Sequence, residues 1–537
     1  MPERSAGKFA AVSFRSVAEP SDRLVSPDRA ELVPCVVALG VNDGHRHEGE
    51  FVTSRSTKRT RLLLGIAASF ALVVAACGSD EDAGSDTSDA PPAATDAPDA
   101  TDAPAGTDAP DATDAPDTTD AMLGEATGEP MKIGVQNLEG DPNGSFPEFS
   151  LAMQAAAEYV NTELGGLGGR PIELVLCKSV VSPDDSQRCA NELAADEVEM
   201  AISTINFFGN HFSIYQGSDI PVLVVTPITI ADFTSEGVYA IGAGGGCLGV
   251  HTGLVQFATE QITEFEDITI DRVAVPWADT PPGVVCYNDL EAKPLDVLIG
   301  TTPGDAERAG SMPDLTHIGV PIAPATPDMT PQATEVLDSD PSVIIFSAQG
   351  ADCWNFVDAL GRLGWTPQDI PLVLSGACTD FAAMEAAGDL ADGIYITGSV
   401  NGLLTPLDGL EGEHLEMATT YQTKGAEYGL SEDDLFKGFA TQGFSAIMNI
   451  WEASNGVEGD VTGKAIADVF AATDGSKPAF GGPPLNCADA PAPYIAVCSS
   501  EIAMDQWDAA SKSIKNVLPK FSGLDLVAGT ELRPTAE

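Results

Sequence analysis

Short apolar runs that alternate with helical segments constrain the fold of this chain more than any other feature. The first four runs are residues 132–135, 172–176, 200–204 and 221–225. A helix over about 146–164 ends at Gly165–Gly169, and a second, to about residue 195, begins with Ser182 as N-cap and Pro183 at its first position. Continuous apolar strands between helices are typical of a parallel sheet with both faces covered.

The same alternation resumes further along the chain. Strands are predicted at 272–275, 342–346, 371–374 and 393–397, with helices over 352–363 and about 435–454. The part from residue 131 to residue 537 has about 400 residues, enough for two domains. Two blocks of alternating strands and helices therefore predict two α/β lobes.

Cys77 lies between two segments of opposite character. Before it, the basic stretch Lys58–Arg61 precedes the 15 uncharged residues Leu62–Ala76, and after it residues 78–130 carry 15 acidic side chains and no basic one. This order is typical of an export signal, and the tetrad Val74–Cys77 resembles a bacterial lipobox. The resemblance implies a diacylglycerol on Cys77 and a mature protein anchored to a membrane. The alternative is a transmembrane helix, for which the apolar run is short.

The segments around this cysteine predict the organisation of the N-terminal part. Residues 1–51 show no periodic pattern, and we interpret them as an extension that results from a misplaced start, followed by the signal peptide over 52–76. Residues 77–130 hold the lipidated cysteine and a linker that repeats Thr-Asp-Ala-Pro. One charge sign, regular prolines and few large apolar residues predict a disordered, extended tether. A glycosylated stalk is the alternative.

The charge of the chain excludes nucleic acid as a partner. The sequence has 81 acidic and 26 basic residues, and its formal net charge is −55, whereas nucleic-acid binding requires a basic surface. The glycines Gly244–Gly246 lack the Lys-Ser/Thr pair of a phosphate-binding loop, and no CxxC pair suggests zinc. We expect no cofactor and no metal.

Eight cysteines of the body form an even set in a chain that is expected to be exported, which predicts disulfides. Eight cysteines allow 105 connectivities, so the sequence leaves the pairing open. We expect sequential pairs: Cys177–Cys189, Cys247–Cys286, Cys353–Cys378 and Cys487–Cys498. The last pair is the best supported, because the turn-rich stretch 489–493 separates its cysteines.

Several short motifs follow one another along the body in a specific order. They are Ile133–Val135 before a Gly/Pro loop, Gly168–Leu174, Ser186–Ala190, Ile220–Leu223 leading to Thr226-Pro227, Gly361–Trp365 and Ala391–Tyr395. No single motif is decisive, but together they cover about residues 132–507. In order and spacing they resemble the substrate-binding proteins of the branched-chain amino acid and amide type, which are the receptor components of ABC importers.

The resemblance implies an α/β fold of two Rossmann-like lobes with parallel sheets, joined by a hinge, as in type I periplasmic binding proteins, which close on their ligand. Within a body of residues 131–530, lobe 1 would hold 131–252 and 400–485, lobe 2 would hold 253–399 and 486–515, and 516–537 would be a tail. The implied partners are a small-molecule ligand, an ABC importer permease and the membrane, reached through the lipid anchor. We expect a monomer on the outer face of the cell membrane.

The candidate site lies on loops that follow strands, because ligands of open α/β sheets bind beyond the carboxyl ends of the strands. The candidate ligand-binding residues are Asn206, Phe207, Thr226, Thr229, Trp277, Gln349 and Ser375. Hydroxyl and amide groups suit a ligand carboxylate, and the aromatic rings suit a larger apolar group. Three of the residues also have purely structural interpretations: Phe207 as core, Thr229 as a helix cap and Gln349 as a partner of its loop backbone.

One departure from the family pattern bears on the ligand. Amino-acid binders of this family hold the ligand ammonium with an acidic side chain on a second-lobe loop, and the corresponding position here is Ala377. Asp352 and Asp380 lie nearby but out of register, and burying an unpaired ammonium is costly. The expected ligand is an amino acid, an amide or a small carboxylate, and Ala377 argues against a standard α-amino acid.

Two other functions were weighed. An enzyme is disfavoured, because the sequence has no Gly-x-Ser-x-Gly or His-Glu-x-x-His motif and the histidines of the body are scattered. The alternative function is a surface lipoprotein that senses a ligand and reports to a partner receptor without transport. A sensor fused to a kinase or channel would need a membrane-spanning helix after Trp507, where the sequence is polar.

Overall fold

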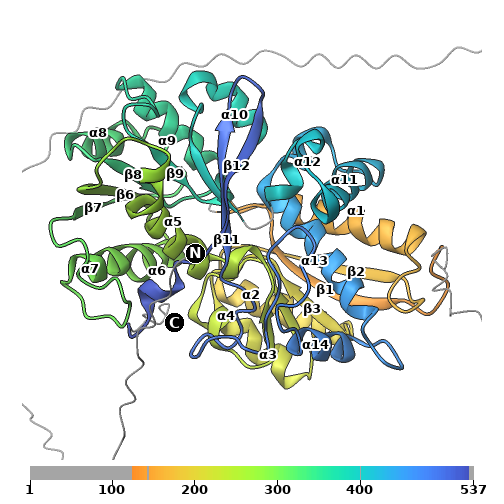
Figure 1. The fold of residues 1–537 in the computed structure, drawn as a ribbon. Coiled ribbons are helices and arrows are strands. Elements are labelled where there is room, and N and C mark those ends of the chain that lie inside the picture. The colour runs from red at the N-terminus through yellow and green to blue at the C-terminus, as the bar shows by residue number, and fades with distance from the viewer. Residues whose placement is uncertain (1–123, 142–143, 399–400, 531–537) are drawn as a thin grey trace, which may run out of the picture. The chain divides into compact units, whose positions relative to one another are not determined.

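The structure, a computed structural model, describes residues 124–141, 144–398 and 401–530. They fall within one compact unit, which is built on two β-sheets (Figure 1). Residues 1–123, and with them Cys77, the export signal and most of the expected tether, lie outside the described part of the chain.

The first lobe is built on a five-stranded parallel sheet in the order β2-β1-β3-β4-β5. Its strands are β1 (Met131–Leu138), β2 (Ile172–Ser179), β3 (Met200–Ser203), β4 (Val222–Val224) and β5 (Val238–Ala240). The helices between them are α1 (Pro147–Glu163), α2 (Pro183–Ala195), α3 (Phe212–Gly217) and α4 (Ile230–Thr234). The parallel order confirms the covered sheet that the apolar runs predict.

Helices from much later in the sequence complete this lobe. They are α11 (Gly412–Glu427), α12 (Glu432–Leu435), α13 (Gly438–Ser454) and α14 (Gly463–Ala471), and Figure 1 shows the blue α13 and α14 beside the orange and yellow elements of the early chain. α13 is almost wholly buried and packs on α1. The approach is close at Gly443, where a Cβ would lie 2.6 Å from the carbonyl oxygen of Phe149.

The second lobe is built on a seven-stranded sheet in the order β12-β11-β10-β9-β8-β6-β7, in which β11 runs antiparallel to both neighbours. Its strands are β6 (Arg272–Ala278), β7 (Thr316–Ile322), β8 (Val343–Phe346), β9 (Leu372–Leu374), β10 (Tyr395–Gly398), β11 (Ile502–Asp508) and β12 (Ser513–Phe521). Its helices are α5 (Cys247–Thr259), α6 (Pro281–Tyr287), α7 (Lys293–Ile299), α8 (Thr330–Asp338), α9 (Ala351–Arg362) and α10 (Phe381–Ala387).

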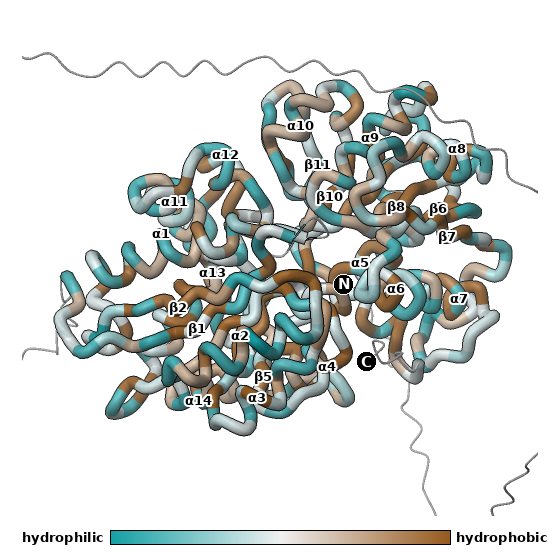
Figure 2. Tube along the Cα trace, turned by 180° about the vertical axis from the view of Figure 1, so that it is seen from behind, coloured by the Kyte–Doolittle hydropathy of each residue, from teal (hydrophilic) through white to brown (hydrophobic). Residues whose placement is uncertain are grey.

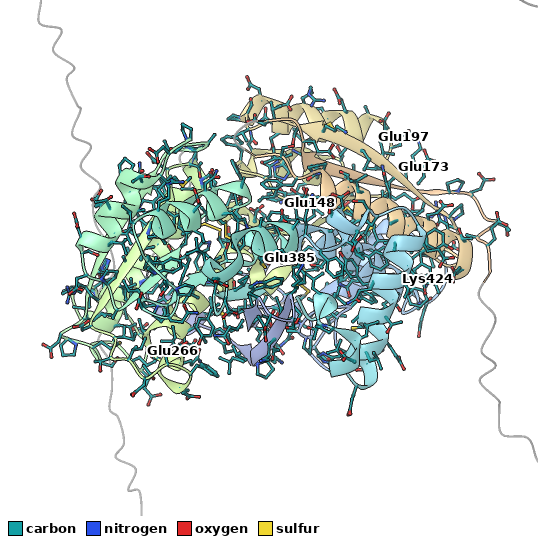
Figure 3. All side chains as sticks on the ribbon, turned by 90° about the horizontal axis from the view of Figure 1, so that it is seen from above. Glu148, Glu173, Glu197, Glu266, Glu385 and Lys424 are labelled. Carbon is teal, nitrogen blue, oxygen red and sulfur yellow. A yellow bond between two sulfur atoms is a disulfide. The ribbon has the colours of Figure 1, made fainter. Side chains whose placement is uncertain are left out.

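Apolar side chains gather along the sheets, and most acidic ones lie outside. Figure 2 shows the hydrophobic colour in strands of both sheets, where β4 and β8 are buried throughout. Glu173 on β2, Glu197 in the turn after α2 and Glu385 on α10 are exposed (Figure 3). The acidic character of the described part is therefore mainly a property of its surface, where it favours solubility.

The chain changes lobes at positions that differ from the expected ones. α5 packs on β8, β9, β10 and β11, so the first change comes before Cys247 and not at residue 252. Residues 486–498 stay with lobe 1, because Cys498 N donates to Ala240 O at 3.1 Å and Ala496 N to Phe233 O at 3.0 Å. The expected tail from residue 516 begins inside β12 and is therefore partly sheet.

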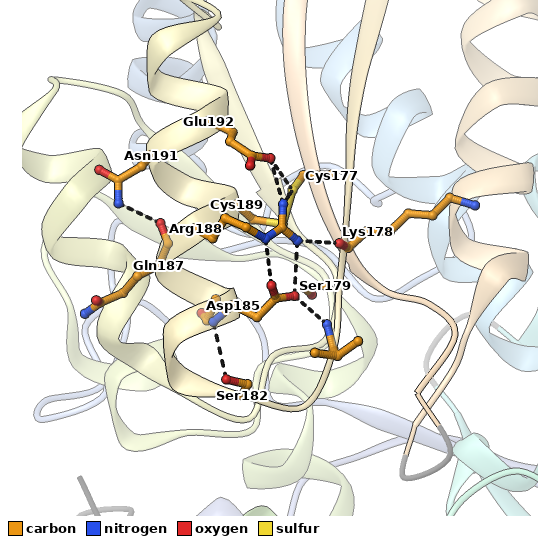
Figure 4. Close-up of polar contacts among 12 residues, drawn as sticks. Cys177, Lys178, Ser179, Ser182, Asp185, Gln187, Arg188, Cys189, Asn191 and Glu192 are labelled. Carbon is orange, nitrogen blue, oxygen red and sulfur yellow. Dashed lines mark hydrogen bonds and ion pairs between the residues drawn. A yellow bond between two sulfur atoms is a disulfide. The ribbon is translucent and has the colours of Figure 1, made fainter.

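The four disulfides of the structure are Cys177–Cys189, Cys247–Cys286, Cys353–Cys378 and Cys487–Cys498, which is the sequential pairing. The first of them joins β2 to α2. Figure 4 shows it beside Arg188, which pairs with Asp185 at 2.6 Å and with Glu192 at 2.7 Å. The N-cap of α2 is Ser182, as expected.

Candidate functional site

A cavity lies where strand-end loops of the two sheets meet. It encloses about 860 Å³ of space not filled by atoms, part of which is open to solvent. Loops that follow β3 and β4 of the first sheet, and β6, β8 and β9 of the second, contribute to its wall. This is the edge at which open α/β sheets bind ligands.

The wall on the side of lobe 1 is mostly apolar, with one polar pair. Ile205 and Phe207 follow β3, Ile228 follows β4, and Phe439 comes from α13. The polar pair is Thr226 and Gln442, and the hydroxyl of Thr226 donates to Gln442 Oε1 at 2.7 Å. The bond assigns the oxygen of the Gln442 amide to Thr226, and the N–H groups of this amide are donors.

The wall on the side of lobe 2 combines small residues with isolated hydroxyl and amide groups. The lining residues of this lobe that follow strands are Ala278, Thr280, Ser347, Ala348, Gln349, Ser375, Gly376 and Ala377. The hydroxyl of Thr280 caps α6 by accepting from Gly283 N at 3.1 Å, so its proton is available to another acceptor. The hydroxyl of Ser375 instead donates to Ala348 O at 3.2 Å.

His251 is the ionisable side chain of the wall. It lies on α5, and its Nδ1 is 2.8 Å from Glu291 Oε1 and 3.1 Å from the hydroxyl of Ser347. Glu291 is completely buried on a π-helical turn, Asn288–Ala292, a type of turn that is frequent at functional sites. Burial raises the pKa of the Glu291 carboxyl, and the contacts with His251 and Ser347 oppose that shift.

A disulfide also forms part of the wall. Cys247 and Cys286 both line the cavity, and their sulfur atoms lie within 4.8 Å of a ring nitrogen of His251. Thiolates and imidazoles are the ligands that zinc prefers. Here the two sulfurs are joined to each other, so neither is a thiolate that would bind a metal. In this state the pair contributes apolar surface and a covalent link between α5 and α6.

The cavity wall carries little charge. Of the described residues that line it, none is Asp, Glu, Lys or Arg, and His251 is the one side chain that can become charged near neutral pH. An ammonium group would therefore find no carboxylate on the wall to pair with. Ala377, where the family pattern would place an acidic residue, does line the cavity.

The structure brings four of the seven expected ligand-binding residues together. Phe207, Thr226, Gln349 and Ser375 line the cavity. Phe207 and Thr226 come from the first lobe, and Gln349 and Ser375 come from the second. The strand-end rule therefore predicted loops of both lobes that the structure places on the wall of one cavity; that these residues bind a ligand stays a prediction.

The other three expected residues are not among those that line the cavity. The amide of Asn206 is used within its own lobe, since it donates to Ser186 Oγ at 2.9 Å and accepts from Phe208 N at 2.8 Å. Thr229 is the N-cap of α4 and forms a capping box with Asp232.

Trp277, the third of these residues, stacks on Tyr287 with ring centroids 5.0 Å apart and an interplanar angle of 5°. Tyr287 lies on α6 of the same lobe. The neighbouring residue Ala278 lines the cavity instead. This difference of one position follows from the alternation of side chains along a strand.

Sequence reasoning missed the residues that helices bring to the cavity. His251 and Cys247 lie on α5, and Gln442 and Phe439 on α13. Their segments are long apolar runs in which no local motif marks a site. The one available signal was a lone histidine within the otherwise uncharged run 247–259.

In the described ranges, which begin at residue 124, no helix has both the length and the apolar character needed to cross a bilayer. The expected lipid anchor at Cys77 precedes these ranges.

Comparison with known proteins supports the fold and the kind of site. Residues 305–489 match the family model described as periplasmic binding protein. No curated protein matches the sequence. The resemblance to substrate-binding proteins and the expected type I fold are confirmed by the family match and by the solved structures that follow.

Three solved structures illustrate the similarity. The fatty acid ABC transporter substrate-binding protein from Thermomonospora curvata has 14% identity and a TM-score of 0.56, with 78% of this chain and 99% of that chain covered. A branched chain amino acid ABC transporter from Thermus thermophilus with bound valine has 13% identity and a TM-score of 0.56, with 75% and 99% covered. A solute binding protein from R. palustris in complex with 4-hydroxybenzoate has 17% identity and a TM-score of 0.53, with 73% and 97% covered. At these identities the likeness shows the fold.

Proposed function

We propose that the chain is an extracytoplasmic receptor, anchored by a lipid on Cys77, that binds one small molecule between its lobes and delivers it to an ABC importer. The observation that carries this proposal is the cavity. Two separate sheets contribute strand-end loops to one largely apolar wall with a few isolated polar groups, which is the usual composition of a small-molecule site. Among the similar structures, the branched chain amino acid ABC transporter from Thermus thermophilus holds valine and the solute binding protein from R. palustris holds 4-hydroxybenzoate.

The proposed mechanism is a shift between two populations. A ligand in the cavity contacts both walls only when the lobes are close, so its binding free energy stabilises that arrangement. The chain permits such a movement at few places, because the described residues change lobes only near 241–246, 401–412 and 498–502. The closed form would then dock on the permease as a monomer. No covalent chemistry on the ligand is required.

Binding is tested by a thermal-shift screen of the full chain with amino acids, amides, ureas, short carboxylates and aromatic acids. A ligand that binds only the folded protein must raise the melting temperature. At a ligand concentration of 100 Kd the free energy of unfolding increases by about 2.7 kcal/mol. The variant Ala377→Phe fills the cavity and should abolish the shift. Ala382→Phe is the matched control, because Ala382 is exposed on α10. A screen without any shift would contradict the proposal.

The anchor and the transport step need separate tests. Replacing Cys77 by Ala should release the protein from the membrane fraction into the medium or periplasm, and it should abolish labelling with radioactive palmitate. Cells that lack the protein should lose uptake of the ligand identified by the screen. Binding without any loss of uptake would favour the alternative function, a lipoprotein that senses the ligand and reports to a partner receptor.

A further inference from the structure

The cavity wall offers hydrogen-bond donors but no anion. The amide N–H groups of Gln442 are donors, and the hydroxyl of Thr280, which accepts from Gly283 N, retains its own proton. No carboxylate is present on the described wall to receive a cation. A ligand ammonium would therefore meet only neutral acceptors here, whereas a carboxylate finds several donors.

His251 adds a donor whose strength depends on protonation. Glu291 and Ser347 engage its Nδ1, and among the described residues none forms a hydrogen bond with its Nε2. The side chain is 10% exposed, and the residue lines the cavity. Because Nδ1 is already engaged, Nε2 is the ring nitrogen that remains for a ligand.

The number of protons on the His251–Glu291 pair determines whether Nε2 presents a hydrogen or a lone pair to a ligand. With two protons the pair is neutral overall, and Nε2 carries a hydrogen in both arrangements: a charged imidazolium beside a carboxylate, or a neutral imidazole that accepts at Nδ1 from a protonated Glu291. With one proton, Nδ1–H donates to the carboxylate, Nε2 presents a lone pair, and the pair has a net charge of −1. A ligand carboxylate is attracted in the first case and repelled in the second.

Other ionisable groups near the pair do not change the number of protons that His251 and Glu291 share. On the same π-helical turn as Glu291, Asp289 is ion-paired with Lys293 of α7 at 2.6 Å. On α6, burial together with the charges of Glu291 and Asp296 raises the pKa of the Tyr287 hydroxyl, so this group stays neutral. On the β8 side the partner is the hydroxyl of Ser347, which does not titrate in this range.

We propose that the ligand of this cavity is an apolar monocarboxylate, and that His251, held by Glu291, donates from Nε2 to its carboxylate. The inference rests on the proposed binding function and specifies its substrate class. The apolar wall takes the body of the ligand, and the N–H groups of Gln442 and the hydroxyl of Thr280 are the further donors within the cavity. Because binding needs the two-proton state of the pair, it should take up protons and weaken as pH rises.

The test uses two matched sets of probes: hexanoate, hexanamide and norleucine, and phenylpropionate, phenylpropionamide and phenylalanine. Affinities are measured by titration calorimetry on the full chain from about pH 6 to about pH 9, in buffers of different ionisation enthalpy. We expect both carboxylates to bind with proton uptake, and to bind about tenfold or more tighter at the lowest pH than at the highest. The amides and the amino acids should bind more weakly at every pH below neutrality.

Variants distinguish direct binding of the ligand carboxylate by His251 from a purely structural role of this residue. His251→Gln keeps a donor of similar size but cannot titrate, so carboxylate affinity at low pH should fall about tenfold and its pH dependence should vanish. Glu291→Gln should fold and should change the pH dependence of carboxylate binding, because it replaces the ionisable partner of Nδ1 by an amide that cannot titrate. His317→Gln is the control: this histidine of β7 pairs with Asp296 at 3.2 Å away from the cavity, and its replacement should change neither property.

The outcomes distinguish the two proposals. Tighter binding of the amides or the amino acids, or carboxylate binding that is unchanged in His251→Gln, overturns the carboxylate inference and leaves the receptor function standing. Failure of all six probes overturns the carboxylate inference. If the wider screen described above also finds no ligand, the receptor function fails with it.

Discussion

The disulfide Cys247–Cys286 should stabilise the second lobe more than Cys177–Cys189 stabilises the first. A cross-link removes loop-closure entropy from the unfolded chain, and the amount grows with the length of the loop. The sequence separations are 39 and 12 residues. With ΔS ≈ −2.1 − 1.5R ln n, the two links contribute about 4 and about 3 kcal/mol to the free energy of unfolding.

The perturbations are the double variants Cys247→Ala/Cys286→Ala and Cys177→Ala/Cys189→Ala. Alanine is chosen because all four side chains are buried, and a serine hydroxyl would add an uncompensated polar group. Urea unfolding is followed by circular dichroism. The data are fitted with a separate unfolding transition for each lobe, because two lobes need not unfold together. Each variant should lower the midpoint of its own lobe's transition at an unchanged slope.

Two results would refute this reasoning. One is an equal or larger loss from the shorter loop, which would show that closure entropy does not dominate. The other is a loss in both transitions from either variant, which would show that the lobes are energetically one unit. Because Cys247 and Cys286 also line the cavity, the first variant should weaken ligand binding, and the second should leave it unchanged.

Three further predictions follow from particular contacts. Thr226→Val leaves the amide oxygen of Gln442 without its 2.7 Å donor, which should cost about 1–3 kcal/mol in urea unfolding if no water replaces the hydroxyl. Burial raises the pKa of Asp232 from 3.8 to about 6, so its contribution to stability is fully present below about pH 4 and is lost as pH rises through 6. The loss should approach roughly 3 kcal/mol, and Asp232→Asn should flatten this part of the stability–pH profile. Gly246→Ala places a Cβ 1.9 Å from the carbonyl oxygen of Pro227 at a backbone φ of +59°, so its melting temperature should fall well below that of the wild type.

The sheets were predictable because their strands are continuous apolar runs, but the later elements of lobe 2 were not. β11 and β12 are antiparallel, and β12 is an edge strand in which only Ile514 and Phe521 are buried, while Lys515 and Lys520 are exposed. In the sequence such an exposed strand cannot be distinguished from a polar loop, which is why residues from 516 onward were predicted to be a tail. α5 is buried on nearly every side, so its composition does not reveal the lobe to which it belongs.

The site was predictable as far as backbone topology determines it. The carboxyl ends of parallel strands specify the loops, and four of the seven expected residues lie on the cavity wall. Successive side chains of a strand point to opposite faces, which explains why Ala278 and not Trp277, both at the end of β6, reaches the cavity. His251 and Gln442 reach it only because α5 and α13 pack against the loops, and that information is contained in the tertiary structure alone.

The return of α13 to the first lobe has a consequence for how the protein is made. The five strands of that lobe are complete at Ala240, but the helix that packs on α1 is synthesised only from Gly438 to Ser454. In between, the emerging polypeptide exposes apolar surface that nothing yet covers, and contacts of such long sequence separation form slowly. β11, which lies between β10 and β12, is synthesised later still. Neither lobe can mature before α13 and β11 have been synthesised, so premature collapse and self-association are the hazards in the folding of this protein.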